Sequence, residues 1–383
     1  RKCATEVIMK KRLFTAALIV LVAALTLGCF TACYGDADYF ADLAEYGFWA
    51  NDPEEAIAQP KIGQLVRDFL NSPLPDGKTA KKVAFIGYDG CRADALINVL
   101  DTPDEIGGDN STSLYSGIAE VLKGEDAGIY YAYAGGQKGK DSEQHTSTAP
   151  GWAALTTGVW GVENGITDNG MPKRIEHKTF MLEAAEGAFG GVNYRTTFAA
   201  SWLAHFNENY MDEIEYLREH SASPVAKVEP SGADAETVTA YLDAIAESTD
   251  ITMRHKYVTD DAALHEYLLS CVQESGENER DIIFGIYEGT DHNGHGTGFG
   301  NDNYKYIKGF RDEDAMAYEL LQAIYSRPSF QSEDWLIVIT TDHGGIETWH
   351  GGQTLEERST WIVCNKPIDE KYMGSGYDGY TEK

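Results

Sequence analysis

Three uninterrupted apolar runs constrain the fold of this chain more than any other feature of its sequence. They are VAFIGYDG at 83–90, DIIFGIYEG at 281–289 and DWLIVITTDHGG at 334–345, and each ends in Asp or Gly. Runs of this kind are typical of strands buried on both faces of a parallel sheet. Helical patterns at 260–275 and 313–326 precede the second and third runs. The sequence therefore predicts an α/β fold, with a central, mostly parallel sheet flanked by helices on both faces.

The first 33 residues are expected to be an export signal and not part of the fold. Three basic residues at 10–12 precede an apolar run at 13–27, which is shorter than the roughly 20 residues of a membrane span. Met9 is the expected start of translation. Cys29 and Cys33 both follow small residues, in settings that resemble a bacterial lipoprotein cleavage box. Three alternatives stay open, which are lipidation at one of these cysteines, a plain cleaved signal and an uncleaved anchor. Each predicts an exported protein, periplasmic or at the cell surface.

The rest of the chain divides by composition into two parts. Residues 34–80 are expected to be a tether and lead-in, and 81–383 the main folded domain. Residues 220–260 are rich in Ala, Ser, Glu and Asp and carry little strand pattern, which predicts a surface excursion or a small cap over the site.

The charge of the chain limits its partners. The formal net charge is −30 at pH 7, and a surface this acidic repels the phosphate backbone of duplex nucleic acid. An anionic substrate must therefore meet positive charge that is supplied locally. Membrane contact is expected only through an N-terminal lipid anchor, and the oligomeric state stays open.

Metal-capable side chains occur where the predicted strands end. Sheets of this type gather their sites at the carboxyl ends of the strands, and Asp and His are ligands that suit Zn²⁺. A single Asp after a strand is more often a turn or cap residue, but the repetition here favours a metal site. The candidate ligands are three Asp and four His, namely Asp89, Asp291, His292, His295, Asp342, His343 and His350.

A separate segment supplies a candidate nucleophile. Pro150 is followed by a mainly apolar run that stops at Gly158, which predicts a short helix with Thr148 at or near its N-terminus. In isolation Thr148 is a capping residue. Beside metal ligands, its hydroxyl is a candidate nucleophile that a metal ion could ionise.

The order of these residues resembles that of the alkaline phosphatase superfamily. The Thr-x-Thr-x-Pro stretch that closes in Thr-Thr-Gly is most similar to the nucleotide pyrophosphatase/phosphodiesterase (type I phosphodiesterase) branch. The resemblance implies two Zn²⁺ ions and a contact from Asn169 to a phosphoryl oxygen. It assigns one zinc to Asp89, Thr148, Asp342 and His343, and the other to Asp291, His295 and His350. One departure is Gly151, where the family commonly has Asn.

The expected function is cleavage of phosphodiester or pyrophosphate bonds through a phospho-threonine at Thr148, with a small phosphate ester or nucleotide as substrate. A phosphomonoesterase, a phosphoethanolamine-type transferase and, outside enzymes, an acidic metal-binding lipoprotein are the alternatives. No Lys or Arg occurs from 144 to 170, and a neutral Asn169 suits a singly charged diester better than a monoester. The aromatic residues at 198, 202, 206 and 210 either stack a base or form core. His145 and His292 are expected to lie outside the site chemistry.

Overall fold

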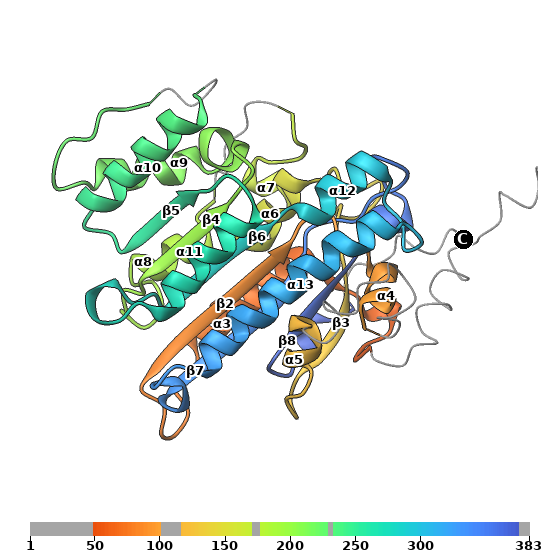
Figure 1. Cartoon of the computed structure of the whole chain (residues 1–383), viewed down its shortest axis with the longest axis horizontal. Helices are drawn as coiled ribbons and strands as arrows, with labels where there is room; N and C mark the ends of the chain where they lie inside the picture. The colour runs from red at the N-terminus through yellow and green to blue at the C-terminus, as the bar shows by residue number, and fades with distance from the viewer. Residues whose placement is uncertain (1–48, 101–115, 171–176, 229–232, 375–383) are drawn as a thin grey trace, which may run out of the picture. The chain divides into compact units, whose positions relative to one another are not determined.

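The computed structural model describes residues 49–100, 116–170, 177–228 and 233–374 (Figure 1). All of them belong to one compact unit, Tyr46–Lys383. The expected signal, with Met9, Cys29 and Cys33, lies outside the described residues. Among the residues that are described, no helix is both long and apolar enough to cross a membrane.

The centre of the fold is an eight-stranded sheet in the order β1-β3-β8-β7-β2-β6-β4-β5. Strand β8 pairs antiparallel with β3 and β7, and all other neighbours are parallel. The strands are β1 Ile57–Ala58, β2 Ala80–Tyr88, β3 Gly128–Tyr133, β4 Thr196–Ala200, β5 Met253–Tyr257, β6 Ile282–Tyr287, β7 Glu333–Thr341 and β8 Ser359–Cys364.

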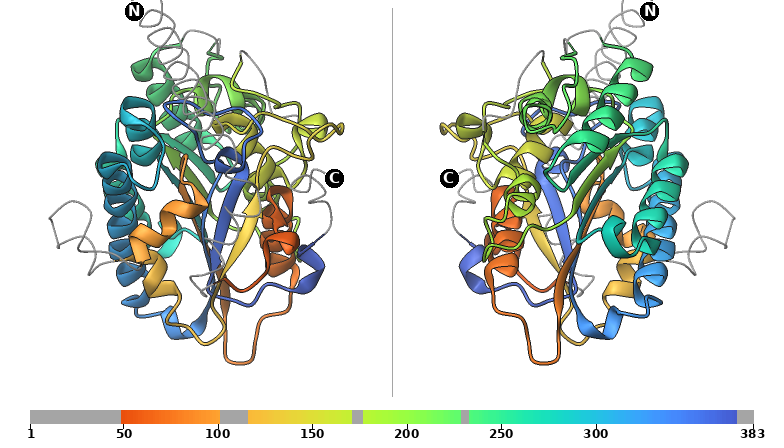
Figure 2. Two further views of the ribbon diagram at one scale, coloured as in Figure 1. Left: turned by 90° about the vertical axis from the view of Figure 1, so that its right-hand side faces the viewer. Right: turned by 90° about the vertical axis from the view of Figure 1, so that its left-hand side faces the viewer.

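Helices cover both faces of this sheet, as the two side views in Figure 2 show. One layer contains α3, α6 and α8, and the other contains α11 and α13. The predicted α/β fold is therefore confirmed. The helices are α3 Gln59–Asn71, α4 Leu96–Leu100, α5 Gly117–Val121, α6 Thr148–Thr157, α7 Gly161–Asn164, α8 Phe180–Ala185, α9 Met211–Glu219, α10 Ala235–Ser248, α11 Asp261–Gln273, α12 Gly289–Thr297, α13 Tyr304–Tyr325 and α14 Leu355–Arg358.

The three apolar runs become the three adjacent central strands β7, β2 and β6. Tyr88 is in register with Thr341 on one side and with Tyr287 on the other, so these strands end at the same level. The next residues, Asp89 and Asp342, therefore leave the sheet side by side. This register is what collects the candidate ligands at one edge of the sheet.

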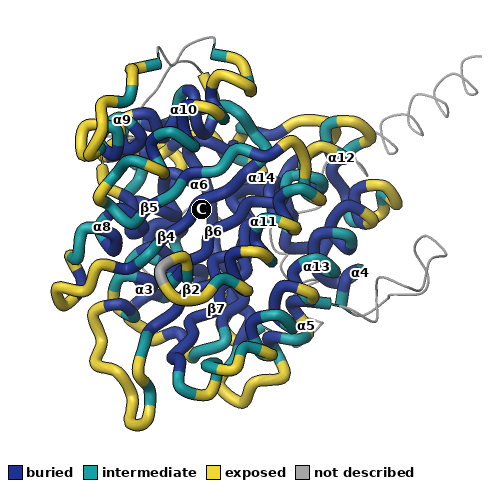
Figure 3. Tube along the Cα trace, turned by 60° about the vertical axis from the view of Figure 1, so that its left-hand side comes forward, coloured by how far each residue is buried: buried dark blue, intermediate teal, exposed yellow. Residues whose placement is uncertain are grey.

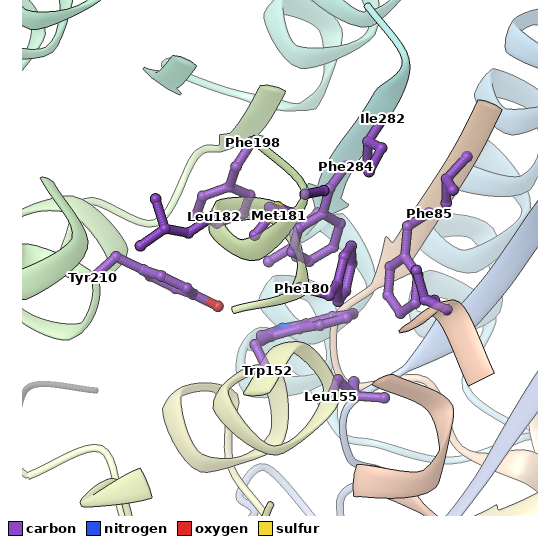
Figure 4. Close-up of a cluster of buried hydrophobic side chains, with 14 of the residues drawn as sticks. Phe85, Trp152, Leu155, Phe180, Met181, Leu182, Phe198, Tyr210, Ile282 and Phe284 are labelled. Carbon is purple, nitrogen blue, oxygen red and sulfur yellow. The ribbon is translucent and has the colours of Figure 1, made fainter. Parts of the chain in front are cut away.

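Burial follows the layering, with the strands dark in Figure 3 and the exposed loops at the periphery. Between the sheet and the α6 layer, aromatic rings pack against one another (Figure 4). Phe284 of β6 lies 5.1 Å from Phe85, 4.9 Å from Phe198 and 5.8 Å from Trp152, measured between ring centroids. The end of the sheet that carries the site thus rests on a close-packed apolar layer.

Two segments differ from the sequence expectation. The lead-in contributes β1, which pairs with β3, and α3, whose Ile62, Leu65 and Val66 join the core. Residues 253–257, expected within a surface excursion or cap, instead form β5, the edge strand beside β4. This strand was not predicted because it has no apolar run. At the edge of the sheet Arg254 and Lys256 are only half-buried, so polar residues are tolerated there.

Candidate active site

Thr148 is the first residue of α6 and points at the ligand-bearing edge of the sheet. The N-cap is Ser147, whose side chain makes no capping hydrogen bond. The Thr148 hydroxyl lies 3.4 Å from Asp89 Oδ1 and 3.4 Å from His343 Nε2, and the residue is 7% exposed. The helix start therefore presents a nearly buried hydroxyl to two candidate ligands.

The first ligand cluster surrounds His343. Its Nε2 lies 3.4 Å from Asp89 Oδ1 and 3.4 Å from Asp342 Oδ2. Its Nδ1 lies 2.7 Å from the carbonyl oxygen of Gly344. A carbonyl can only accept, so Nδ1 carries a proton and Nε2 is the nitrogen that faces the carboxylates, where a metal ion would replace its proton.

The second cluster joins α12 to the loop that follows β7. Asp291 and His295 are four residues apart on α12, with Asp291 Oδ2 3.4 Å from His295 Nε2. His350 Nε2 lies 3.0 Å from His295 Nε2 and 3.7 Å from Asp291 Oδ1. His295 Nδ1 lies 2.9 Å from the carbonyl of Thr348, which fixes its tautomer in the same way.

These groups have the arrangement of metal ligands. The ligand atoms of Asp291, His295 and His350 lie within 4.8 Å of one another, as do those of Asp89, Asp291 and His343. At this site two buried carboxylate oxygens, Asp291 Oδ1 and Asp342 Oδ2, have no hydrogen-bond donor among the described residues. A buried charged oxygen without a donor is costly, and a cation would satisfy both. The residues present therefore fit metal ions.

The ionisation of the site is consistent with this interpretation. Burial and the Asp89 carboxylate raise the pKa of Asp291 to about 7. Burial and the same carboxylate also hold the pKa of Asp342 well above its usual value. Burial and the nearby imidazoles lower the pKa of His350 to about 2. Burial would lower the pKa of His343, but the carboxylates of Asp342 and Asp89 outweigh it and raise that pKa to about 10.

Asn169 contacts the residue that follows the candidate nucleophile Thr148. Its Oδ1 accepts the backbone N–H of Ala149 at 2.8 Å. This bond directs the Asn169 amide to the start of α6. The Ala149 N–H is occupied by this bond, and the Asn169 Nδ2 is left to donate to a phosphoryl oxygen.

Gly151 has a steric explanation. A Cβ built at this position would lie 2.8 Å from Asp342 Cβ and 2.9 Å from the Asp342 carbonyl oxygen. The first turn of α6 therefore approaches β7 too closely for any side chain, and Asn, which the related family commonly has here, would not fit.

A cavity of about 240 Å³ opens in front of Thr148. Its lining includes Asn169, Trp202, Glu288 and His292 beside the candidate ligands. His292, which was expected to lie outside the site chemistry, is exposed and borders this cavity. Phe198, Phe206 and Tyr210 are at most 1% exposed and belong to the core, so among the four aromatic residues only Trp202 reaches the cavity.

Several residues that support the site were not identified from the sequence. The Trp152 indole N–H donates to Asp89 Oδ2 at 2.8 Å, and its place four residues after Thr148, on the same helix face, was the available signal. Gln59 of α3 donates to the carbonyl of Asp342. Glu288 accepts the Trp202 N–H at 2.6 Å and the Ser201 hydroxyl at 2.9 Å. The contacts of Gln59 and Glu288 join segments that are distant in sequence, so no local sequence pattern indicates them.

A nearly buried hydroxyl thus lies beside two Asp/His clusters at the carboxyl edge of a mostly parallel sheet. Residues 141–363 match the family described as type I phosphodiesterase / nucleotide pyrophosphatase. This chain belongs to that family and is a phosphoester hydrolase, which confirms the family predicted from its motifs.

Solved structures give more distant similarities. Alkaline phosphatase from the Antarctic bacterium TAB5 is 15% identical with a TM-score of 0.44, over 77% of this chain and 93% of that one. Murine ectonucleotide pyrophosphatase/phosphodiesterase 5 is 17% identical with a TM-score of 0.38, over 69% of this chain and 57% of that one. A 2-O GAG sulfatase is 13% identical with a TM-score of 0.43, over 76% and 66%. A search of curated proteins returned no match.

Proposed function

We propose that this protein hydrolyses phosphodiester or pyrophosphate bonds in small phosphate esters such as nucleotides, with Thr148 as nucleophile and two zinc ions as cofactors. The observation that carries the proposal is the position of the Thr148 hydroxyl, 3.4 Å from both Asp89 and His343. Asp89, Asp342 and His343 would hold one ion, and Asp291, His295 and His350 the other. Zinc bound there would lower the pKa of an adjacent hydroxyl and offset the charge of the phosphoryl oxygens.

In the proposed hydrolysis, Thr148 and Asn169 have separate roles. Thr148 Oγ1 gives up its proton to water and forms a bond to phosphorus, while the bond from phosphorus to the leaving oxygen breaks. The leaving oxygen takes the electron pair and a proton from water. Asn169 Nδ2 donates to a phosphoryl oxygen throughout. A water molecule then attacks the phospho-threonine and restores the Thr148 hydroxyl.

Neighbouring hydroxyls are less suited to this role. Thr146 Oγ1 donates to the carbonyl of Gly352 at 2.8 Å and accepts the Gly351 N–H at 3.2 Å. It therefore joins the His350 loop to the start of α6. The Ser147 hydroxyl, at the N-cap, is buried and makes no hydrogen bond to a described residue. The contacts of Thr148, in contrast, are with Asp89 and His343.

The charges around the cavity favour diesters over monoesters. Among the described residues that line the cavity there is no Lys or Arg. Arg92 is engaged by Asp94, with the closest ion-pair distance 2.6 Å. Lys173, another cation considered, lies outside the described residues. A singly charged diester needs less positive charge than a dianionic monoester, and its second ester group can lie toward Trp202.

The murine relative has also been solved in complex with AMP, which supports including a nucleotide in the substrate panel. The test measures kcat/KM for a phosphate monoester, a diester, a pyrophosphate and a sulfate, with zinc present. The diester or pyrophosphate should be turned over best. A higher kcat/KM for p-nitrophenyl phosphate than for bis-p-nitrophenyl phosphate would contradict the diester assignment and favour a phosphomonoesterase. Transfer of the phosphoryl group to an added alcohol in place of water would favour a transferase.

The nucleophile is tested on the same protein. Thr148→Ala should lower kcat by several orders of magnitude, while the zinc content stays within a factor of about two, because the Asp and His ligands remain. Thr148→Ser keeps a hydroxyl and should retain measurable turnover. Acid-quenched enzyme should carry phosphate on Thr148, and phosphate found on Thr146 or Ser147 would overturn the assignment.

The proposal includes export, and a lipid anchor at Cys29 or Cys33 that would hold the enzyme at the cell surface. It is supported by the sequence pattern alone. Cells expressing the full chain should place it in the membrane fraction, and changing both cysteines to Ala should release it. Unchanged fractionation of the double variant would contradict lipidation.

A further inference from the structure

Helix α12 carries two ligands of the second cluster, and the register of its first turn decides where they point. The four N–H groups that open a helix have no partner within the helix. In the described structure the N-cap residue, Glu288, makes no side-chain hydrogen bond to this turn; its carboxylate accepts instead from Ser201 and Trp202. Asp291 is the third residue of α12 and belongs to this first turn. Any loosening of the turn therefore moves a candidate ligand.

Two carboxylates from other helices accept the N–H groups at the start of α12. Asp261, the first residue of α11, accepts the N–H of Glu288 at 3.0 Å and the N–H of Gly289 at 2.8 Å. Glu313 of α13 accepts the N–H of Thr290 at 2.7 Å and its hydroxyl at 2.6 Å. Three consecutive backbone donors are thus satisfied from outside the helix, and the negative charge lies where the helix dipole favours it.

The surroundings leave α12 little freedom to shift. Glu313 is 1% exposed and Thr290 is fully buried. A Cβ at Gly309 of α13 would lie 2.6 Å from Asn293 Nδ2 and 3.1 Å from the carbonyl oxygen of Gly289. The two helices therefore pack almost backbone to backbone at the turn that Glu313 holds.

This anchoring matters because the second cluster is assembled from separate segments. Asp291 and His295 belong to α12, whereas His350 lies on the loop after β7 and is joined to α6 through the Thr146 contacts with Gly351 and Gly352. The separation of 3.0 Å between His295 Nε2 and His350 Nε2 persists only while α12 keeps its register relative to that loop.

We propose that Asp261 and Glu313 are positioning residues, which hold the first turn of α12 so that Asp291 and His295 meet His350 in the geometry a metal ion requires. The proposal rests on the metal clusters of the proposed function, but not on the reaction. Outer partners that orient ligands typically change metal affinity by about 10- to 100-fold when removed.

The experiment compares four variants of the full chain, which are Glu313→Ala, Glu313→Gln, Asp261→Asn and Asp314→Ala. Glu313→Ala removes both acceptors of Thr290, and Glu313→Gln keeps one acceptor and the side-chain volume. Asp314→Ala is the matched control: Asp314 is the next residue of α13, is also 1% exposed, and accepts from the Ile118 N–H at 2.9 Å and the Tyr88 hydroxyl at 3.1 Å. Within the described structure its carboxylate accepts no hydrogen bond from α12, so Asp314→Ala reports the general cost of losing a buried carboxylate.

Two readouts are measured, zinc affinity by chelator competition and amide hydrogen exchange of the metal-free protein. Glu313→Ala should lower the affinity of the second cluster for zinc by about 10- to 100-fold and speed amide exchange at 288–295. Glu313→Gln should recover part of both, and Asp261→Asn should act in the same direction. Equal changes in Asp314→Ala and Glu313→Ala, or unchanged affinity and exchange in Glu313→Ala, would overturn the proposal. A wild-type protein that binds no zinc would refute the proposed function instead, and the exchange readout would still test the anchoring of α12.

Discussion

Replacing Trp152 by Phe should separate two contributions of this side chain, the hydrogen bond that orients Asp89 and the packing of its ring in the core. The Trp152 ring is fully buried, lies 5.8 Å from Phe284 between ring centroids, and covers Gly87 of β2 so closely that a Cβ there would overlap it. Its N–H donates to Asp89 Oδ2 at 2.8 Å. Asp89 is 1% exposed, so no bulk water replaces the lost donor. Phe keeps most of the apolar ring and removes the donor.

The expected cost has two parts. A hydrogen bond to a charged group contributes about 1.5–3 kcal/mol, and trimming a fully buried ring costs on the order of 1 kcal/mol more. Only the first part concerns the orientation of Asp89. If all of it were expressed in metal binding, the affinity of the first cluster would fall by about 10- to 150-fold, at 1.4 kcal/mol for each factor of ten.

The assay is activity as a function of free zinc, with chelator-buffered metal. The Trp152→Phe variant should need about 10- to 150-fold more zinc for half-maximal activity and recover most of its kcat at saturation. Trp335→Phe is the control, because Trp335 donates to Glu333 Oε2 at 2.8 Å and is 4% exposed, but lies at the start of β7. Equal zinc dependence in the two variants, or a kcat loss in Trp152→Phe that zinc cannot restore, would refute the reasoning.

Four further outcomes are expected. His350→Ala should reduce bound zinc from about two ions to about one by elemental analysis, with the fold retained in circular dichroism. Gly151→Asn should lower the thermal midpoint and the zinc affinity together, since its side chain would displace Asp342, whereas a fully active variant would show that α6 can move. Because burial and the Asp89 carboxylate raise the pKa of Asp291 to about 7, the metal-free protein should lose stability as pH rises toward and through that value; Asp291→Asn should therefore raise the alkaline thermal midpoint of the metal-free protein and lower that of the zinc-loaded one. Trp202→Ala should raise KM for a nucleotide ester more than it lowers kcat, as measured by steady-state kinetics.

Much of the fold was predictable because its decisive signals are local. Strands buried on both faces must be apolar along their whole length, so β2, β6 and β7 were visible as runs of sequence. Their carboxyl ends carry the ligands, and one family match covers Thr148 and all the candidate ligands except Asp89. The edge strand β5 and the short β1 were not visible, since half-buried or two-residue strands leave no apolar run.

Tertiary structure alone decided how the candidate residues are supported and which of them reach the substrate. The three aromatic residues buried in the core and Trp202 at the cavity share one sequence spacing, and only packing distinguishes them. The contact of Trp152 with Asp89 crosses from helix to sheet, and the contacts of Glu313 and Asp261 with α12 join separate helices. Local sequence determines which residue can be a ligand, because chemistry belongs to the side chain. The orientation of that ligand depends on side chains distant in sequence, because a hydrogen bond forms only after the chain has folded.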